Sequence, residues 1–345
     1  MNKKLILTSM MGLAVSGAFA VSPMWLRDVK LSPAGDKIAF EYKGDIYSVP
    51  ASGGKATRLT DGTSYDCNPV WNPDGTGIAY SSDRNGGSDI YFMGADGSNP
   101  LRLTFNSAAE TPEAFTADGK SVIFSATLQD PASSVLAPMR SNSELYTVPV
   151  TGGRISQLLP TPAVNVEFVP GTDIMVFEDV KGNEDKWRKH HTSSITRDIW
   201  AWQPSSGTFT NLTDHAGEDR DPAPSPDGKT LYFLSERDGG SFNVYSMPVN
   251  GKGAVTRLTD FTTHPVRFLS SAANGLLAFT YNGEIYTMHP GSKPVKVNID
   301  VTDTGSDEDA TIRFSNAEES AVSPDGKYLY FSSDMPGGFG GKDIW

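Results

Sequence analysis

The sequence has 345 residues, of which 38% are hydrophobic and 10% aromatic, and it contains 34 Gly and 23 Pro. This composition is typical of a folded, turn-rich β protein and excludes a wholly disordered chain, which would lack the aromatic residues. The formal net charge of −12 argues against nucleic acid or an anionic membrane surface as the main partner. The single cysteine, Cys67, excludes an internal disulfide.

The first twenty residues have the pattern of a secretory signal peptide. Lys3 and Lys4 precede an apolar stretch from Leu5 to Val15, and Ala18-Phe19-Ala20 matches an A-x-A cleavage site. The apolar stretch is short and interrupted by Ser and Gly, which disfavours the alternative of an uncleaved membrane anchor. We therefore expect an exported protein, in the periplasm of a Gram-negative bacterium, with no membrane span after cleavage.

A four-part unit recurs along the chain. It begins with a turn such as Asn72-Pro-Asp-Gly75, in which Pro fixes the first corner and Asp-Gly closes the turn. An alternating apolar strand such as Gly77-Ile-Ala-Tyr80 follows, then a strand such as Asp89-Ile-Tyr91, then one such as Arg102-Leu-Thr104. The glycines of the turns are Gly35, Gly75, Gly119, Gly171, Gly228, Gly275 and Gly326.

Four short strands per unit, repeated six times at this spacing, are the signature of β-propeller blades around a central channel. The sequence therefore predicts an all-β protein, a six-bladed propeller of four-stranded blades spanning residues 21–298. The first unit already contains four strands. We therefore expect the ring to close by packing between complete blades rather than by a shared strand.

The chain changes character after residue 298. Residues 299–319 are predicted to be an acidic linker, and residues 320–345 an incomplete propeller repeat that starts a second domain. The alternative is a seven-bladed ring completed by an unusual last blade. The acidic run 300–309 weakly resembles a calcium-binding loop but lacks its full spacing, so a solvated linker is the preferred interpretation.

No motif indicates catalysis, a cofactor or a metal site: G-x-S-x-G, H-E-x-x-H, P-loop and paired-Cys patterns are all absent from the sequence. His190 and His191 lie beside Ser193 and Ser194 in an insertion within the fourth unit, but adjacent residues of an extended segment point to opposite faces. We predict instead a polar loop that covers the channel mouth. Its candidate partner-binding residues are Trp187, Arg188, His190, His191 and Arg197.

Four aspartates occupy equivalent strand starts, at Asp45, Asp89, Asp198 and Asp343. A metal site needs ligands that converge, and one carboxylate per blade does not converge. The preferred interpretation is a hydrogen bond from each strand end to an adjacent turn.

The Ser-Pro-Asp-Gly-Lys, Leu-Tyr-Phe, Asp-Ile-Tyr and Arg-Leu-Thr elements over residues 26–298 resemble the repeats of TolB and of the N-terminal propeller of tricorn-type proteases. The insertion 185–200 is similar to a basic-aromatic segment of the tricorn-type propeller, as is the order of six blades, a spacer and a fresh repeat. The resemblance implies the non-catalytic propeller region of an exported serine peptidase, which binds or channels peptides toward a protease domain absent from this chain.

Residues 328–345 resemble instead the repeats found ahead of OmpA-like peptidoglycan-binding domains. This resemblance implies the alternative of a TolB-like interaction scaffold in the cell envelope. A TolB orthologue would carry an α/β domain ahead of the propeller, whereas about six residues separate the cleavage site from the first predicted strand. Under either reading the expected partners are peptides or proteins at a propeller face, with self-association left open. A propeller enzyme acting at the channel mouth is a third hypothesis.

Overall fold

Each of the six sequence repeats forms one four-stranded antiparallel sheet in the computed structural model. The structure describes residues 20–21, 23–128, 142–182, 187, 192–238, 240–302, 318–333 and 343–344. We number the six sheets as blades one to six in chain order. Within each blade the strands follow the chain from the innermost to the outermost position.

The first three blades comprise β2 (Arg27–Leu31), β3 (Lys37–Tyr42), β4 (Asp45–Pro50) and β6 (Thr57–Arg58); β7 (Asp66–Trp71), β8 (Gly77–Ser82), β9 (Asp89–Gly94) and β10 (Leu101–Arg102); β11 (Glu110–Phe115), β12 (Ser121–Ala126), β13 (Glu144–Pro149) and β14 (Ser156–Leu159). The last three comprise β15 (Ala163–Phe168), β16 (Met175–Asp179), β17 (Ile199–Gln203) and β18 (Thr208–Asn211); β19 (Asp219–Pro224), β20 (Thr230–Ser235), β21 (Asn243–Pro248) and β22 (Thr256–Arg257); β23 (Val266–Ser271), β24 (Leu277–Tyr281), β25 (Glu284–Met288) and β26 (Val295–Lys296).

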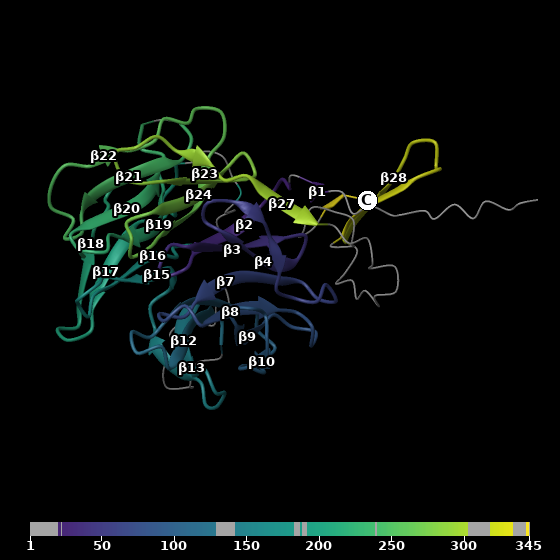
Figure 1. The fold of residues 1–345 in the computed structure, drawn as a ribbon, viewed down its shortest axis with the longest axis horizontal. Coiled ribbons are helices and arrows are strands. Elements are labelled where there is room, and N and C mark those ends of the chain that lie inside the picture. The colour runs from purple at the N-terminus through teal and green to yellow at the C-terminus, as the bar shows by residue number, and fades with distance from the viewer. Residues whose placement is uncertain are drawn as a thin grey trace, which may run out of the picture.

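The blades are arranged in a ring (Figure 1), and a cavity lined by residues of all six innermost strands lies in its central channel. Each innermost strand contacts the innermost strands of the blades before and after it, and β23 of blade six contacts β2 of blade one. The predicted all-β, six-bladed propeller is confirmed, and the seven-bladed alternative is wrong. No helix among the described residues is long and apolar enough to cross a membrane.

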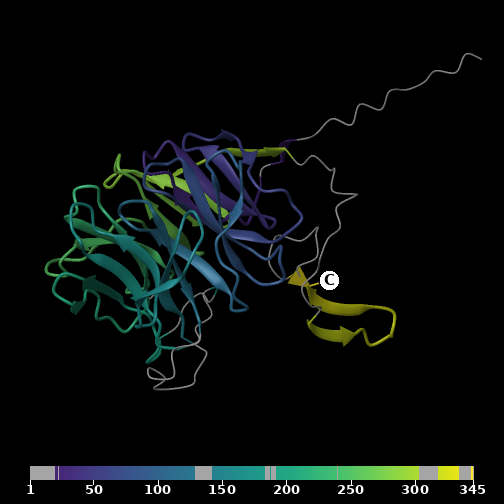
Figure 2. The same ribbon diagram turned by 90° about the horizontal axis from the view of Figure 1, so that it is seen from below.

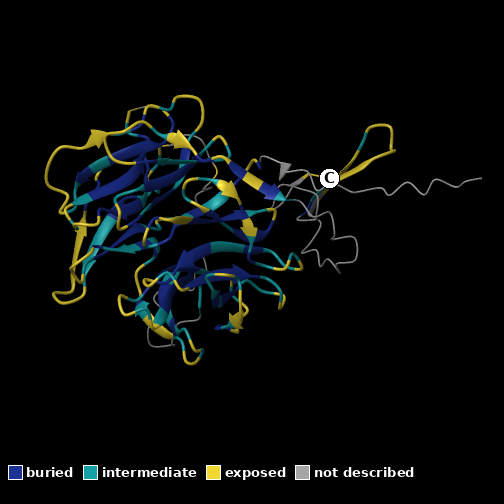
Figure 3. Cartoon of the chain, in the orientation of Figure 1, coloured by how far each residue is buried: buried dark blue, intermediate teal, exposed yellow. Residues whose placement is uncertain are grey.

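The hydrophobic core is divided among the six interfaces between neighbouring blades. Six clusters of buried side chains lie one at each interface. The second strands are the most deeply buried, as in β8, all of whose residues are buried, whereas the outermost strands are mostly exposed (Figure 3). A strand with both faces buried needs apolar residues on both faces, which explains segments such as Gly77-Ile-Ala-Tyr80.

The recurring threonine of the fourth strand has a defined partner. Thr104 Oγ1 accepts a hydrogen bond from the backbone N–H of Ile90 at 2.8 Å, next to the start of the third strand. The same bond joins Thr60 to Ile46, Thr213 to Ile199 and Thr259 to Val244. The Asp-Ile-Tyr and Arg-Leu-Thr elements of these blades are therefore two sides of one contact.

The aspartates at the strand starts hold neighbouring segments. Asp45 accepts hydrogen bonds from the Thr60 hydroxyl at 2.8 Å and from the backbone N–H of Gly62 at 2.9 Å. This is the predicted strand-end bond to an adjacent turn. Asp89 pairs with Arg102 at 2.8 Å, and Asp198 pairs with the Lys181 ammonium at 2.7 Å. The side chain of Asp343 lies outside the described residues.

The ring is closed by a small additional sheet. β27 (Ile299–Thr302), which follows blade six, pairs in parallel with β5 (Gly54–Lys55) of blade one and antiparallel with β1 (Ala20–Val21). Ile299 and Val301 are buried in the cluster between blades one and six. The prediction that complete blades close the ring by packing alone therefore missed a strand, and β27 lies at the start of the segment predicted to be a linker.

A second small sheet lies outside the ring (Figure 2). It consists of β28 (Glu318–Val322), β29 (Leu329–Ser333) and β30 (Asp343–Ile344), paired antiparallel in that order. The strands coincide with the repeat predicted for residues 320–345. Its large apolar side chains Val322, Tyr328, Leu329, Tyr330 and Ile344 are exposed.

Candidate functional site in the central channel

A β-bulge interrupts each innermost strand at the same place. The pairing with the second strand shifts register within every one of the six inner strands, for example between Cys67 and Val70 in β7. In five of the six the residue at the bulge has a positive φ: Asp28, Asn68, Asn165, Asp221 and Phe268. Asp and Asn tolerate this conformation best among residues with a side chain. Blade three is the exception because it has Pro112 at this place, and the proline ring restricts φ to negative values.

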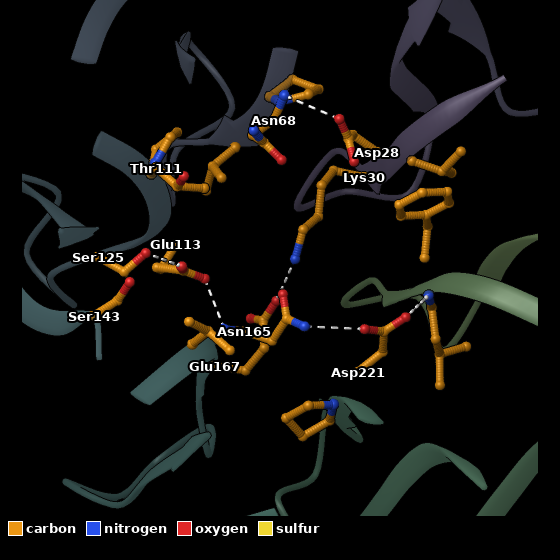
Figure 4. Close-up of a pocket in the computed structure, with 18 of the residues that line it drawn as sticks. Asp28, Lys30, Asn68, Thr111, Glu113, Ser125, Ser143, Asn165, Glu167 and Asp221 are labelled. Carbon is orange, nitrogen blue, oxygen red and sulfur yellow. Dashed lines mark hydrogen bonds and ion pairs between the residues drawn. The ribbon is translucent and has the colours of Figure 1, made fainter. Parts of the chain in front are cut away.

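The bulges border a cavity of about 260 Å³ in the channel, lined by residues of all six inner strands. Its wall carries the carboxylates of Asp28, Glu113, Glu167 and Asp221, together with the cations of Lys30 and Arg197. Figure 4 shows Lys30 extending from β2 toward Glu167, with Glu113 and Asp221 on either side. The channel is therefore polar where it passes between the bulges.

Two carboxylates of the cavity each join their blade to the next one. Glu113 Oε2 of blade three accepts the backbone N–H of Asn165 of blade four at 2.7 Å, and its Oε1 accepts the Ser125 hydroxyl at 2.6 Å. Asp221 of blade five accepts the backbone N–H of Leu269 of blade six at 3.2 Å. The bulge turns these N–H groups out of the strand ladder, and the acid of the preceding blade satisfies them.

Asn165 is the centre of this network. Its side-chain Nδ2 donates to Glu178 Oε1 at 2.5 Å and to Asp221 Oδ1 at 3.2 Å. The other oxygen of Glu178 accepts from Arg197 Nη1 at 2.8 Å. Blades four and five are therefore joined by an amide, two carboxylates and a guanidinium, all at the level of the bulges.

Burial changes the acidity of the cavity carboxylates. Burial raises the pKa of Glu113 to about 7 and that of Asp221 to about 6, and the neighbouring Glu178 carboxylate adds to both. Burial alone would lower the pKa of Lys30, but the charges of Glu167, Asp221 and Glu113 outweigh it and raise this pKa. The cavity therefore holds the Lys30 ammonium charged at neutral pH, while Glu113 is only partly ionised there.

One mouth of the channel carries the blade-four insertion. This is the end at which the innermost strands begin, which we call the amino-end mouth. β16 ends at Asp179, paired with Ala163 at the beginning of β15, so the connection from β16 to β17 leaves at this mouth. The connection from β12 to β13 leaves at the same mouth, because Ala126 pairs with Glu110.

Trp187 of the insertion contacts residues of blades six and one. Its ring lies 5.9 Å from that of Phe268 in blade six, and the guanidinium carbons of Arg27 and Arg267 lie 5.0 and 5.3 Å from its centroid. Arg267 Nη2 also donates to the Trp187 carbonyl at 2.7 Å. Trp187 is nonetheless 44% exposed. An exposed aromatic ring flanked by two guanidiniums is a composition enriched at protein-binding surfaces.

The candidate residues from the sequence are distributed between the mouth and the channel. Trp187 lies at the amino-end mouth, whereas Arg197 lies in the channel wall, paired with Glu178. Arg188, His190 and His191 lie outside the described residues. Ser193 accepts a backbone hydrogen bond within a turn of its own segment.

Sequence reasoning missed the cavity residues other than Arg197. A signal for them exists, because Asp28, Asn68, Asn165 and Asp221 occupy one repeat position upstream of the turn, where Asp or Asn recurs. Lys30 and Glu167 break the repeat and carry no such signal. Within the part of the chain that the structure describes, no group of His, Cys, Asp or Glu side chains is arranged to hold a metal ion.

Comparison with known proteins places the chain in a family. Residues 23–294 match the model of the tricorn protease N-terminal beta propeller domain. The chain is 26% identical over 270 residues to tricorn protease homolog 1 of Streptomyces coelicolor, a match that covers 77% of this chain and 24% of that protein.

Solved structures show the same fold. The tricorn protease matches with a TM-score of 0.67 and 22% identity, over 90% of this chain and 30% of that one. TolB from Acinetobacter baumannii matches with a TM-score of 0.54 and 19% identity, over 72% of this chain and 57% of that one. The chain thus spans about a quarter to a third of the tricorn-type proteins that it matches.

Proposed function

Because the chain belongs to the family of the tricorn protease N-terminal beta propeller domain, we propose that it is the non-catalytic propeller region of an exported tricorn-like serine peptidase. Its role is to bind peptide substrate at the amino-end mouth, and a serine-peptidase domain outside this chain cleaves it. The sequence offers no catalytic motif that would give the propeller a reaction of its own.

The observation that supports peptide binding most directly is the aromatic and cationic surface at the amino-end mouth. Trp187, Arg27 and Arg267 come from blades four, one and six, and all three have solvent-accessible surface there. An indole ring packs against apolar side chains of any sequence, and a guanidinium donates to backbone carbonyls. Such a surface suits a peptidase that accepts many sequences.

A titration of the full chain with fluorescein-labelled β-casein, followed by fluorescence anisotropy, tests this proposal. Trp187→Ala is expected to weaken binding about tenfold, the effect of losing an aromatic hot spot. Phe209→Ala is the matched control, because Phe209 is equally exposed on the outermost strand of the same blade. Absence of casein binding by the unmodified protein overturns the proposal. Binding to purified peptidoglycan instead favours the envelope scaffold.

Export forms a separate part of the proposal and rests on the signal-peptide pattern of residues 1–20. Fractionation of producing cells, with mass spectrometry of the purified chain, is expected to find it in the periplasm with Val21 as its first residue. A cytosolic protein that retains Met1 contradicts export without affecting the peptide-binding proposal.

A further inference from the structure

The side chains of Lys30 and Glu167 meet inside the channel. Lys30 Nζ lies 3.0 Å from Glu167 Oε1, and the two residues are 137 positions apart. Lys30 belongs to blade one and Glu167 to blade four, and blades three steps apart in a six-bladed ring face each other across the axis. Figure 4 shows the two side chains approaching each other within the cavity. This is an ion pair across the channel, unlike the contacts between neighbouring blades described above.

The surroundings keep the Lys30 side chain extended. Asp221 and Glu113, from the blades on either side of Glu167, add their negative charges at the ammonium end. Glu113 is itself fixed by Ser125 and Asn165, and Asp221 by Asn165 and Leu269. A long, flexible side chain loses about 2 kcal/mol of rotamer freedom when it is held in one conformation. The carboxylates of Glu167 and Asp221, together with the partly ionised Glu113, provide the compensating attraction.

The contact lies within the cavity, at the level of the bulges of β2 and β15, and we call this level the waist of the channel. An extended polypeptide needs about 5 Å in its thinner direction, the spacing of hydrogen-bonded strands, and about 10 Å between packed faces. Two side chains in direct contact across the axis do not leave that width. The Asn165 bonds to Glu178 and Asp221 occupy the same level on the wall of blades four and five.

We infer that the Lys30–Glu167 ion pair is a bar that closes the channel at its waist to a polypeptide chain. The amino-end mouth is then a dead-ended binding site and not the entrance to a passage. This inference concerns the same channel as the proposed function, but it does not require that a peptide binds there. The resemblance found in the sequence implied that the propeller binds or channels peptides. A closed channel is compatible with binding at the mouth and excludes the passage of a polypeptide chain.

A cysteine placed at the waist reports on the bar. Val70 lines the cavity, and on β7 it occupies the place that Lys30 occupies on β2, since the two residues pair with the equivalent Ala79 and Ala39. The reporter protein is the full chain with Cys67→Ser and Val70→Cys. Its modification rates with iodoacetamide and with fluorescein maleimide are compared, each relative to a free thiol. If unfolding limits the modification, the relative rate does not depend on the size of the reagent. If the width of the channel at the waist limits it, the bulky reagent reacts more slowly than the small one.

Lys30→Ala in the reporter protein is expected to raise the relative rate of the bulky reagent about tenfold, as local access replaces a larger opening of the structure. The charge-reversed pair Lys30→Glu with Glu167→Lys is expected to return this rate to that of the parent. Lys120→Ala, which breaks an exposed ion pair with Asp118 in the turn between β11 and β12 and outside the cavity lining, is the control and should change nothing. If Lys30→Ala fails to fold, Lys30→Met keeps the length of the side chain and tests the ionic contact alone.

Equal rates for the bulky reagent with and without Lys30 overturn the inference, as does failure of the charge-reversed pair to slow the reaction. If Lys30 only stabilises the fold, Lys30→Ala lowers the free energy of unfolding and accelerates the reactions of both reagents by the same factor. The casein titration is a separate measurement. Absence of casein binding counts against the proposed function, whereas only the cysteine modification rates decide whether the ion pair closes the channel.

Discussion

Glu113 on β11 accepts the backbone N–H of Asn165 on β15 at 2.7 Å, so an acid of one blade fixes the bulge of the next. The bond explains why a buried carboxylate is kept in the channel wall. Without it, the N–H that the bulge turns out of the ladder would be buried without a partner, which costs roughly 1–3 kcal/mol.

Glu113→Gln is expected to change how stability depends on pH. The folded pKa of Glu113, about 7, lies above its ordinary value of 4.5, so its contribution to stability is present below pH 4.5 and is lost as the pH rises through 7. Wild-type stability relative to the variant should therefore fall between pH 5 and pH 8, by up to about 3 kcal/mol. Urea unfolding curves measured across this range test the slope, and parallel pH profiles for the two proteins would contradict it.

Gly53→Ala is expected to weaken ring closure. A Cβ at Gly53 would lie 2.5 Å from the carbonyl oxygen of Asn298, beside the pairing of β5 with β27, whereas one at Gly152 meets nothing within 4 Å. Both glycines have a positive φ, so both substitutions cost roughly 1–2 kcal/mol from the backbone alone. Overpacking should add about 1–3 kcal/mol at Gly53. Thermal unfolding measures both variants, and an equal loss of stability would show that the closure tolerates the methyl group.

Arg84→Met is expected to be strongly destabilising. Arg84 Nη2 lies 3.1 Å from Asp66 Oδ2, and the side chain of Asp66 is completely buried, so the substitution leaves a carboxylate without its cation. The cost of breaking such a pair is about 3–5 kcal/mol, and the double variant with Asp66→Asn should recover part of it. Lys120→Met in the exposed pair with Asp118 should cost no more than about 1 kcal/mol. Urea unfolding compares the variants, and a similar cost at both pairs would refute the argument from burial.

Thr104→Val is expected to cost about 1–2 kcal/mol, because the backbone N–H of Ile90 loses its acceptor in a fully buried position. Thr104→Ser keeps the hydroxyl and should recover the hydrogen bond, with only a small loss of packing. Chemical denaturation separates the two variants. Amide hydrogen exchange at Ile90 gives a local readout, which should accelerate in the valine variant alone.

The fold could be predicted because each repeat encodes its strands and turns locally. Asp-Gly turns, alternating apolar strands and the threonine of the fourth strand have the same roles in successive blades, so six weak signals support one architecture. β27 was obscured by its acidic neighbours, although Ile299-Asp-Val-Thr302 alternates apolar and polar residues as a strand does. The acidic composition after residue 298 indicated a linker. Residues 299–302 nevertheless form a strand, because they pair with β5.

The channel site could be predicted only in part. The bulge residues recur in the repeat, but which blade satisfies each N–H depends on the arrangement of the ring. Lys30 and Glu167 meet only because three blades separate them in a ring of six, which places them on facing walls. A register of strands predicts neighbours within a sheet, and it does not predict a contact across an axis.

The pairing of β27 with β5 also sets an order of events during biosynthesis. The edge formed by Gly54 and Lys55 emerges from the ribosome early, yet its partner, Ile299 and Asp300, is translated almost 250 residues later. At about 5–20 residues per second this edge lacks its partner for roughly 10–50 seconds. The exposed charge of Lys55 suits such an edge, because lysine on an unpaired strand discourages association with other chains. A nascent chain halted before residue 299 should consequently depend on chaperones, and one released after residue 302 should not.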